Sequence, residues 1–492
     1  MVERRKTALM LLVLVATASF VFAYKLGSNS YWLDEMITLY RTQRGWKMHY
    51  HAWPPFYFWL VWIWAKLFGV SEVALRSFSV LWGVLAVLAT FYLGSLFSLE
   101  LGFFASIFLI FNQNMVRYAQ EARGYTMLLA LSALSVILFV RMLEGRARKK
   151  EWCILALINI LGTITHYAFI LFMFSEYLVA FTYTLISKKA SEKSPMGELL
   201  WSLGVWMAFM AVYLVIVHKA LFGNRPVMSP RLGTIGVLTL MVSLVAASLW
   251  QKVILLGLLA SSVILALADH QWRKWVVIVV SITGLFLVLV AIRSLTGQPM
   301  WKVRYLLPVL PLACLLMAYP LSKLSFHRSL LLAAVWVVIT GHHLMTGYYS
   351  KPFKASWREA ASWIKDHHHG ELVVVNWYKY YRRYYLNCEI EHMRCIDAKK
   401  FLKMVKRGKM DLSEVQGIWL LLPQGGKWRW DKEIDALLRD KGFRVNREEI
   451  VGIRSRVIHF LRMREERPVE SEGFLYRLLH AEKGRPSFRE ES

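Results

Sequence analysis

The sequence is poor in charge, and acidic residues are the scarcer of its charged types. Only 19% of its 492 residues are charged, with 33 Asp and Glu against 60 Lys and Arg. Because 57% of the residues are hydrophobic, this composition excludes an ordinary soluble multidomain protein and is typical of a polytopic membrane protein. The basic residues fall largely in short connections between apolar runs and in the C-terminal region. Their placement favours anionic head groups and lipid phosphates as partners and argues against nucleic acid.

Cysteine is also rare, and none of the four cysteines has the spacing of a zinc-ligand pair. Cys153 and Cys314 lie in apolar runs, where buried thiols are common. Cys388 and Cys395 lie in a segment that we expect outside the cytoplasm, where a disulfide can persist. We expect a bridge between them, and free alkylation of both thiols without reductant would exclude it. The His tract at 367–369 falls at a predicted helix end, where the helix dipole favours His without a metal.

A clear signal-peptide cleavage site is missing after the first apolar run. Residues 1–24 have a basic start and an apolar run long enough to span, so we predict an uncleaved helix with a cytoplasmic N-terminus in the cell membrane. The Lys/Arg-rich connections at 141–150, 187–193, 270–274 and 322–328 should then be cytoplasmic as well.

Eleven predicted transmembrane helices satisfy these constraints and leave the C-terminus outside. The further apolar run at 233–249 would reverse every later loop if it spanned, so we interpret it as interfacial or re-entrant. The predicted spans are residues 8–24, 75–97, 101–116, 124–142, 152–166, 168–186, 199–217, 251–268, 275–293, 305–321 and 329–346.

The pattern changes near residue 350, where short helices and strands begin to alternate. This alternation predicts a small α/β domain. We divide the chain into a transmembrane domain at 1–348, with an outer loop at 25–72, an extracytoplasmic α/β domain at 349–462, and a charged tail at 463–492 that we expect to be flexible. The expected fold class is an α-helical polytopic membrane protein with a small C-terminal α/β domain.

Polar side chains concentrate in the predicted outer connections, which a purely structural scaffold does not need. Asp34 and Glu35 lie in "NSYWLDEMITLY", and His51 precedes a Pro-Pro pair that opens an aromatic interfacial helix. Acids in one outer loop and cations in others suggest a site that holds a lipid phosphate and activates a hydroxyl. The candidates in the other outer turns are Arg117, Tyr118, Gln120, Glu121, Arg123, His166, Tyr167, Lys302 and Arg304.

These residue types fit the transfer of a sugar outside the cytoplasm. Nucleotide-sugars are not in ready supply there, so the sugar must arrive on a lipid carrier. A polyprenyl monophosphate leaves readily if Arg or Lys meets the charge that develops on its oxygens. Asp34 would take the proton of the acceptor hydroxyl as it attacks the anomeric carbon. Direct attack on the opposite face inverts that centre.

The order of these motifs resembles that of the GT-C superfamily of integral-membrane glycosyltransferases. The motifs are "LDE" in the first outer loop, "HAWPPFY", "SEVALRSFSVLWGVLAV", "QEARGY", "THY" and "VRYLLPVLPL". The likeness is greatest to the branch of protein O-mannosyltransferases and of enzymes that add aminoarabinose or galacturonic acid to lipid A. It covers nearly the whole chain and implies transfer from a polyprenyl-phosphate sugar to a protein, lipid or glycan hydroxyl.

The resemblance also implies roles for individual residues. Asp34 matches the catalytic base and Glu35 a neighbour that orients the acceptor or the donor. Arg123 and Arg304 match positions that hold the donor phosphate, with Lys302 as a helper. The family's "HPP" appears here as "HAWPP", which leaves His51 without a defined role. Some relatives bind a divalent cation, but a monophosphate donor requires none, and no ligand cluster in the sequence demands a metal.

Structural interpretations compete with these roles. The two acids could be a solvated pair or charges favoured at a helix N-terminus. Arg123 and Arg304 could reach lipid head groups. The other turn residues could hold their own turns through hydrogen bonds, as Gln120, Glu121 and His166 could.

Two other functions would also suit a many-helix protein. A transporter or flippase of a polyprenyl-linked sugar would need a similar phosphate site. It predicts an internal repeat and acids at the midplane of the membrane, and the sequence shows neither. A sensor or scaffold would leave the polar outer turns unexplained. We therefore predict an inverting glycosyltransferase.

Overall fold

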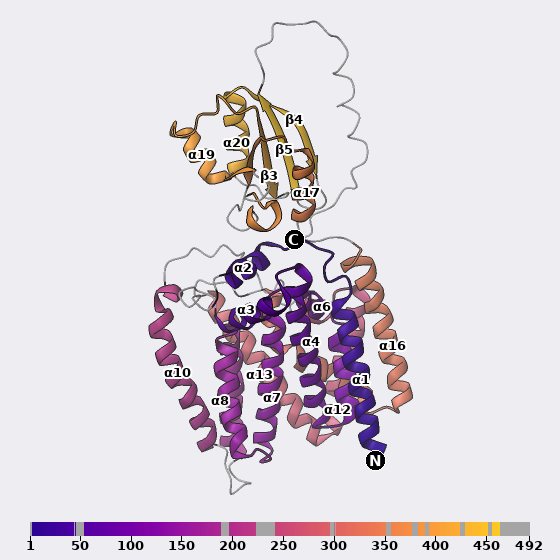
Figure 1. The fold of residues 1–492 in the computed structure, drawn as a ribbon. Coiled ribbons are helices and arrows are strands. Elements are labelled where there is room, and N and C mark those ends of the chain that lie inside the picture. The colour runs from indigo at the N-terminus through magenta and orange to yellow at the C-terminus, as the bar shows by residue number, and fades with distance from the viewer. Residues whose placement is uncertain are drawn as a thin grey trace.

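A helical bundle and a five-stranded sheet form the two parts of the protein in the computed structural model (Figure 1). The structure describes residues 2–43, 45, 54–187, 196–222, 242–295, 300, 302–350, 356–375, 382–388, 393–423, 429–450 and 455–462. His51, the charged tail at 463–492 and most of the run at 233–249 lie outside the described residues.

The bundle consists of long apolar helices with shorter ones at one end. Ser71 caps the longest early helix, α4, by accepting a hydrogen bond from the N–H of Ala74 at 3.2 Å. The elements are α1 (Val2–Ala23), α2 (Leu33–Thr42), α3 (Phe56–Phe68), α4 (Glu72–Ser95), α5 (Leu99–Ile110), α6 (Gln113–Ala119), α7 (Tyr125–Leu143), α8 (Lys149–Thr163), α9 (Ala168–Ser187), α10 (Met196–Phe222), α12 (Leu249–Ala268), α13 (His270–Leu295), α14 (Val303–Leu306), η1 (Leu307–Val309), α15 (Leu310–Ser322), α16 (Phe326–His343) and η2 (Leu344–Tyr348).

The number of full-length spans is lower than the eleven predicted. Within the described ranges, nine helices are long and apolar enough to cross a membrane, or ten if α5 and α6, bent by 67°, form one broken span. The remaining predicted span is α8, whose 15 residues extend only about 22 Å, against a hydrocarbon core of about 30 Å. α8 nevertheless packs inside the bundle against α7, α9 and α10.

The N-terminus and two of the connections predicted to be cytoplasmic, 270–274 and 322–328, share one face of the bundle. Lys6 Nζ lies 2.6 Å from Glu100 Oε1 and 5.5 Å from the ring centroid of Phe326. Lys323 Nζ lies 2.9 Å from Asp269 Oδ2, which joins the connections at 322–328 and 270–274. These contacts gather the N-terminus and the later basic connections at one end, and Figure 1 shows α2, α3 and the sheet at the other.

The apolar run at 233–249 ends on the face that carries α2. Its last residues, 242–248, lie against the break between α5 and α6. The side-chain amides of Asn112 and Asn114 donate there to backbone carbonyls of residues 243–245 at 2.7–3.1 Å. α12 therefore starts at this face, as the re-entrant interpretation of the run requires.

The second part is a mixed sheet with helices on both faces, as the alternating pattern predicts. The strand order is β2-β1-β3-β5-β4, with β1 parallel to β2 and β3, and β5 antiparallel to β3 and β4. Its elements are α17 (Trp357–His367), β1 (Leu372–Val375), η3 (Arg382–Leu386), β2 (Arg394–Asp397), α19 (Ala398–Lys406), β3 (Gly417–Pro423), α20 (Arg429–Asp440), β4 (Phe443–Ile450) and β5 (Ser455–Arg462).

Successive side chains of β1 point to opposite faces of the sheet, and each face packs against a different set of helices. Leu372 and Val374 face the core under α19 and α20. Val373 and Val375 face the opposite way, and their cluster includes α17 and extends into the core of the bundle. The sheet therefore docks on the bundle through the α17 face.

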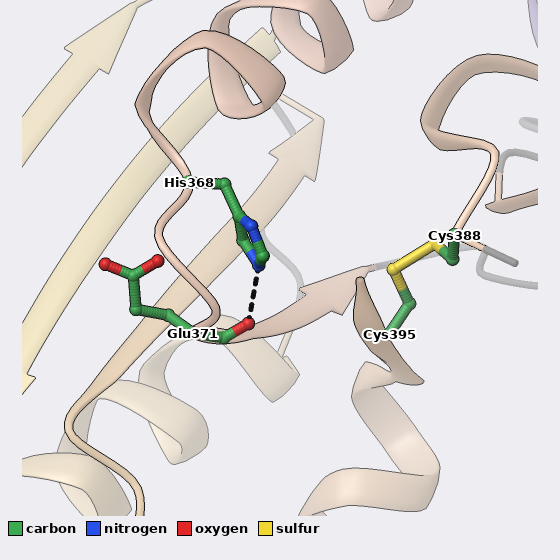
Figure 2. The surroundings of a disulfide bond; sticks show 4 residues. All are labelled: His368, Glu371, Cys388 and Cys395. Atoms are coloured by element: carbon green, nitrogen blue, oxygen red, sulfur yellow. Dashed lines mark hydrogen bonds between the residues drawn. A yellow bond between two sulfur atoms is a disulfide. The ribbon is translucent and has the colours of Figure 1, made fainter. Parts of the chain in front are cut away.

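The two cysteines of this part form a disulfide, Cys388–Cys395, which joins the end of η3 to β2 (Figure 2). The neighbouring His tract makes local hydrogen bonds. His368 Nε2 lies 2.8 Å from the carbonyl oxygen of Glu371, as Figure 2 shows, and His367 Nδ1 lies 2.8 Å from that of Trp363.

Candidate active site

Asp34 lies in the first turn of α2 and forms an ion pair with Arg304, 270 residues later in the chain. Arg304 Nη1 donates to Asp34 Oδ2 at 2.9 Å. The two side chains remain 16% and 18% exposed, so the pair is reachable from outside the protein. Arg304 Nε is buried and has no hydrogen-bond partner among the described residues. The pair combines an accessible carboxylate with a cation that can take a further anionic partner.

Arg123 approaches the same point from the turn between α6 and α7. Its Nη1 donates to the backbone carbonyl oxygen of Asp34 at 3.3 Å, and the side chain is only 4% exposed. The guanidinium lies 5.8 Å from the ring centroid of Phe58 and 5.9 Å from that of Tyr125. Aromatic walls around a buried guanidinium hold it in one place. The structure thus brings together the acid and both arginines of the predicted site.

His166 is an uncharged side chain that lies close to Arg123 and Arg304. Its ring centroid lies 5.8 Å from that of Tyr125 and 5.4 Å from that of Tyr305. Its Nδ1 accepts the N–H of Ala168 at 3.1 Å. Burial, helped by the positive charges of Arg123 and Arg304, lowers the pKa of His166 to about 3. The imidazole is therefore neutral near pH 7.

Lys302 and Tyr118 lie at the edge of the same cluster. Lys302 caps the start of α14, two residues before Arg304. Its own partial burial and the charge of Arg304 lower the pKa of Lys302, and Asp34 opposes this shift. The ring of Tyr118 lies 5.0 Å from that of Tyr125. Both residues therefore border the cluster of Asp34, Arg123 and Arg304.

Glu35 has surroundings that differ from those of Asp34. Arg76 holds its carboxylate with two hydrogen bonds, from Nε to Oε1 at 2.8 Å and from Nη2 to Oε2 at 2.9 Å. The N–H of Ala122 adds a third at 2.9 Å, and that of Trp32 a fourth at 3.3 Å. Glu35 is 0% exposed. Both of its oxygens accept hydrogen bonds from the protein, so Glu35 anchors α2 in this structure.

Three other candidates also hold structure. Gln120 Nε2 donates to the carbonyl oxygens of Phe22 and Tyr24 at the end of α1, at 3.1 and 2.7 Å. Glu121, 1% exposed, lies 3.4 Å from Arg117. Tyr167 lies with its hydroxyl 3.5 Å from that of Tyr213 in α10. The alternative in which Gln120 and Glu121 hold the turn agrees with these contacts.

Arg76 is the residue that sequence reasoning misses. It lies in the second turn of α4, is 1% exposed, and also donates to the carbonyl oxygens of Leu26 and Asn29 at 2.8 Å each. A cation in an apolar span is costly unless it is paired. The Arg in "SEVALRSF" was a signal for a buried acidic partner in a neighbouring loop.

No group of three or more His, Cys, Asp or Glu side chains could hold a metal ion within the part of the chain that the structure describes. The cluster around Asp34 consists of one carboxylate and two guanidinium groups. This set of described residues suits an anion.

The chain is similar to a known protein family and to solved membrane-protein structures. Residues 52–218, from the region of α3 into α10, match the family model described as dolichyl-phosphate-mannose-protein mannosyltransferase. The crystal structure of ArnT from Cupriavidus metallidurans bound to undecaprenyl phosphate is similar with a TM-score of 0.60 at 13% identity, covering 91% of this chain and 97% of that one. The chain therefore shares the fold of this ArnT, the GT-C fold. The apo state of the same ArnT matches with a TM-score of 0.59, again at 13% identity and the same coverage.

The GT-C fold confirms the resemblance drawn from the order of the motifs, and with it the helical membrane architecture and the small C-terminal α/β part. The GT-C fold and the apolar helices identify an integral membrane protein. No curated protein sequence matches the chain significantly.

Proposed function

We propose that this protein is an inverting glycosyltransferase that moves a sugar from a polyprenyl-phosphate donor to an acceptor hydroxyl on the extracytoplasmic side of a membrane. The observation that carries the proposal is the meeting of Asp34, Arg123 and Arg304, which come from three distant segments. A base beside two guanidinium groups is what transfer from a phosphate leaving group requires.

The chemical step uses each of these groups once. The acceptor hydroxyl attacks the anomeric carbon and gives its proton to Asp34. The bond from that carbon to the phosphate oxygen breaks, and the polyprenyl phosphate leaves with the electron pair. Arg123 and Arg304 meet the charge that develops on the phosphate oxygens. Because the leaving group and the attacking oxygen lie on opposite faces, the anomeric centre inverts.

Donor binding must open the pair between Asp34 and Arg304. A sugar ring cannot occupy the 2.9 Å between their polar atoms. A phosphate that takes Nη1 and Nη2 of Arg304 in a bidentate contact would release Asp34 toward the acceptor. The pair therefore holds Asp34 on Arg304 until the donor phosphate replaces it as the partner of Arg304.

The class of donor rests on the fold and on the charge of the site. The similar ArnT structure has undecaprenyl phosphate bound, and the matched family is named for dolichyl-phosphate-mannose. Both compounds are polyprenyl phosphates. A protein, lipid or glycan supplies the acceptor hydroxyl, and the N-terminus lies in the cytoplasm by the placement of Lys and Arg.

The proposal is tested by Asp34→Asn, which keeps the shape of the side chain and removes the base. Transfer of a labelled sugar from a polyprenyl phosphate by protein in liposomes should fall about 10²- to 10⁴-fold. Asp435→Asn is the matched control, because Asp435 is 41% exposed in a surface pair with Arg439. It should transfer at the wild-type rate.

Retained transfer by folded Asp34→Asn protein would remove the mechanism. A transporter would instead move the labelled lipid across the bilayer, with no transfer by the wild type and no effect of the substitution.

A further inference from the structure

The α/β part contacts the loop that leads to Asp34. This loop, residues 24–32, connects α1 to α2. Arg358, in α17, donates from its guanidinium to two carbonyl oxygens of the loop at 3.2 and 3.1 Å. Its backbone N–H donates to Ser30 Oγ at 3.1 Å. The path of the chain into α2 therefore depends on residues more than 300 positions later.

A second contact comes from Tyr385 in η3. Its hydroxyl accepts the N–H of Tyr31 at 2.6 Å and donates to Glu72 Oε1 at 2.9 Å. The hydroxyl of Tyr384 donates to the other oxygen of Glu72 at 3.2 Å, and Arg358 lies 3.6 Å from Oε1. Tyr385 thus joins three segments at one atom: the loop before α2, the start of α4, and η3.

Both tyrosines that make this contact are buried, Tyr31 at 0% and Tyr385 at 9% exposed. Burial, with the negative charge of Glu72, raises the pKa of Tyr385 well above its usual range. Its hydroxyl therefore keeps its proton, donates to Glu72, and accepts from the backbone. The tyrosine side of the contact is therefore uncharged near neutral pH.

η3 is itself fixed to the sheet. The disulfide between Cys388 and Cys395 begins two residues after η3 and ends in β2 (Figure 2). The N–H of Met393 donates to the carbonyl oxygen of Cys388 at 3.1 Å, and β2 pairs with β1. Tyr385 therefore projects from a short segment that is anchored covalently to the edge of the sheet.

We propose that Tyr385 is a positioning residue for the transfer reaction: its hydroxyl fixes the backbone at Tyr31 and thereby the first turn of α2, which carries Asp34. The proposal rests on the function proposed above. Rate depends steeply on the position of a base, and a shift of about 1 Å can cost about 10²-fold. The α/β part thus contributes to the reaction without contacting the sugar.

The test is Tyr385→Phe, which keeps the ring and removes the hydroxyl. We expect kcat to fall roughly tenfold, because the backbone at Tyr31 loses its partner. KM for the polyprenyl-phosphate sugar should stay within about twofold, since Arg123 and Arg304 are untouched. Tyr384→Phe is the matched control, because its hydroxyl contacts Glu72 but not the loop. It should leave kcat near the wild-type value.

Hydrogen–deuterium exchange of full-length protein in nanodiscs gives a readout that does not need activity. A cavity of about 330 Å³ lies beside the contact and lets solvent approach it. The peptide that contains Tyr31 should exchange faster in Tyr385→Phe than in the wild type or in Tyr384→Phe. Unchanged exchange overturns the proposal, as does faster exchange with unchanged kcat. If the wild type transfers no sugar, the proposed function fails, and the role of Tyr385 in transfer fails with it even where exchange is faster.

Discussion

Asp34 and Glu35 are neighbours in the sequence, but the helix turns their side chains in different directions. Asp34 reaches Arg304 at a partly exposed position, and Glu35 reaches Arg76 in a fully buried one. The "LDE" motif therefore joins one accessible acid to one acid that anchors the helix. The sequence could predict the acidic pair, but it could not divide the roles, because the partner Arg76 lies 41 residues away.

At the residue scale, His166 makes a prediction about pH. Its folded-state pKa of about 3 lies below the ordinary value of 6.5. Between these two values the unfolded chain binds a proton that the folded chain does not, so His166 lowers stability as the pH falls below about 6.5. Above that pH its contribution is fully present. The midpoint of thermal unfolding should therefore fall less between pH 7 and pH 5 in His166→Asn than in the wild type.

Asn at this position keeps an acceptor for the N–H of Ala168 and cannot titrate. Intrinsic fluorescence in nanodiscs measures the midpoint at each pH. Parallel pH dependence of the two proteins would show that His166 is not held neutral in the fold.

At the scale of single elements, the ion pair between Glu35 and Arg76 holds α2 on α4. Both side chains are buried, at 0% and 1% exposure. Replacing one partner of a buried pair leaves the other charge without compensation, at a cost of about 3–5 kcal/mol. Glu35→Gln should therefore lower the thermal midpoint by several degrees.

Glu414→Gln changes an exposed glutamate in the α/β part and serves as the control. It should leave the midpoint within about one degree, as exposed substitutions usually do. Equal midpoints for both variants would contradict the anchoring role of Glu35.

Apolar runs predicted most helices because length and hydropathy are local properties. Two features of the bundle depend on contacts between distant parts of the sequence. α8 is too short to span alone, yet it is held by its neighbours in the bundle. The 67° bend between α5 and α6 depends on Asn112 and Asn114, whose amides bind carbonyls about 130 residues later. Contacts of that range leave no periodic pattern in the sequence.

At the scale of the whole molecule, charge placement predicted that the N-terminus and the connections at 270–274 and 322–328 share a face. The contacts of Lys6 with Glu100 and Phe326 and of Lys323 with Asp269 agree with that prediction. The sheet was predictable as a small α/β part from alternating patterns. The docking of the sheet through α17 and η3 could not be predicted. Tyr385 contacts Tyr31 and Glu72, which lie more than 300 residues earlier in the chain, and the sequence alone does not distinguish such a tyrosine from a core residue.

In the proposed mechanism the two arginines hold the phosphate of the donor lipid, and Asp34 is released to act as the base. A cryo-electron microscopy map of the full-length protein in nanodiscs with a polyprenyl phosphate tests this arrangement. We predict that the phosphate lies between Arg123 and Arg304 and that the contact of Arg304 with Asp34, now 2.9 Å, has opened. A phosphate bound elsewhere in the protein, with that ion pair intact, would contradict the account.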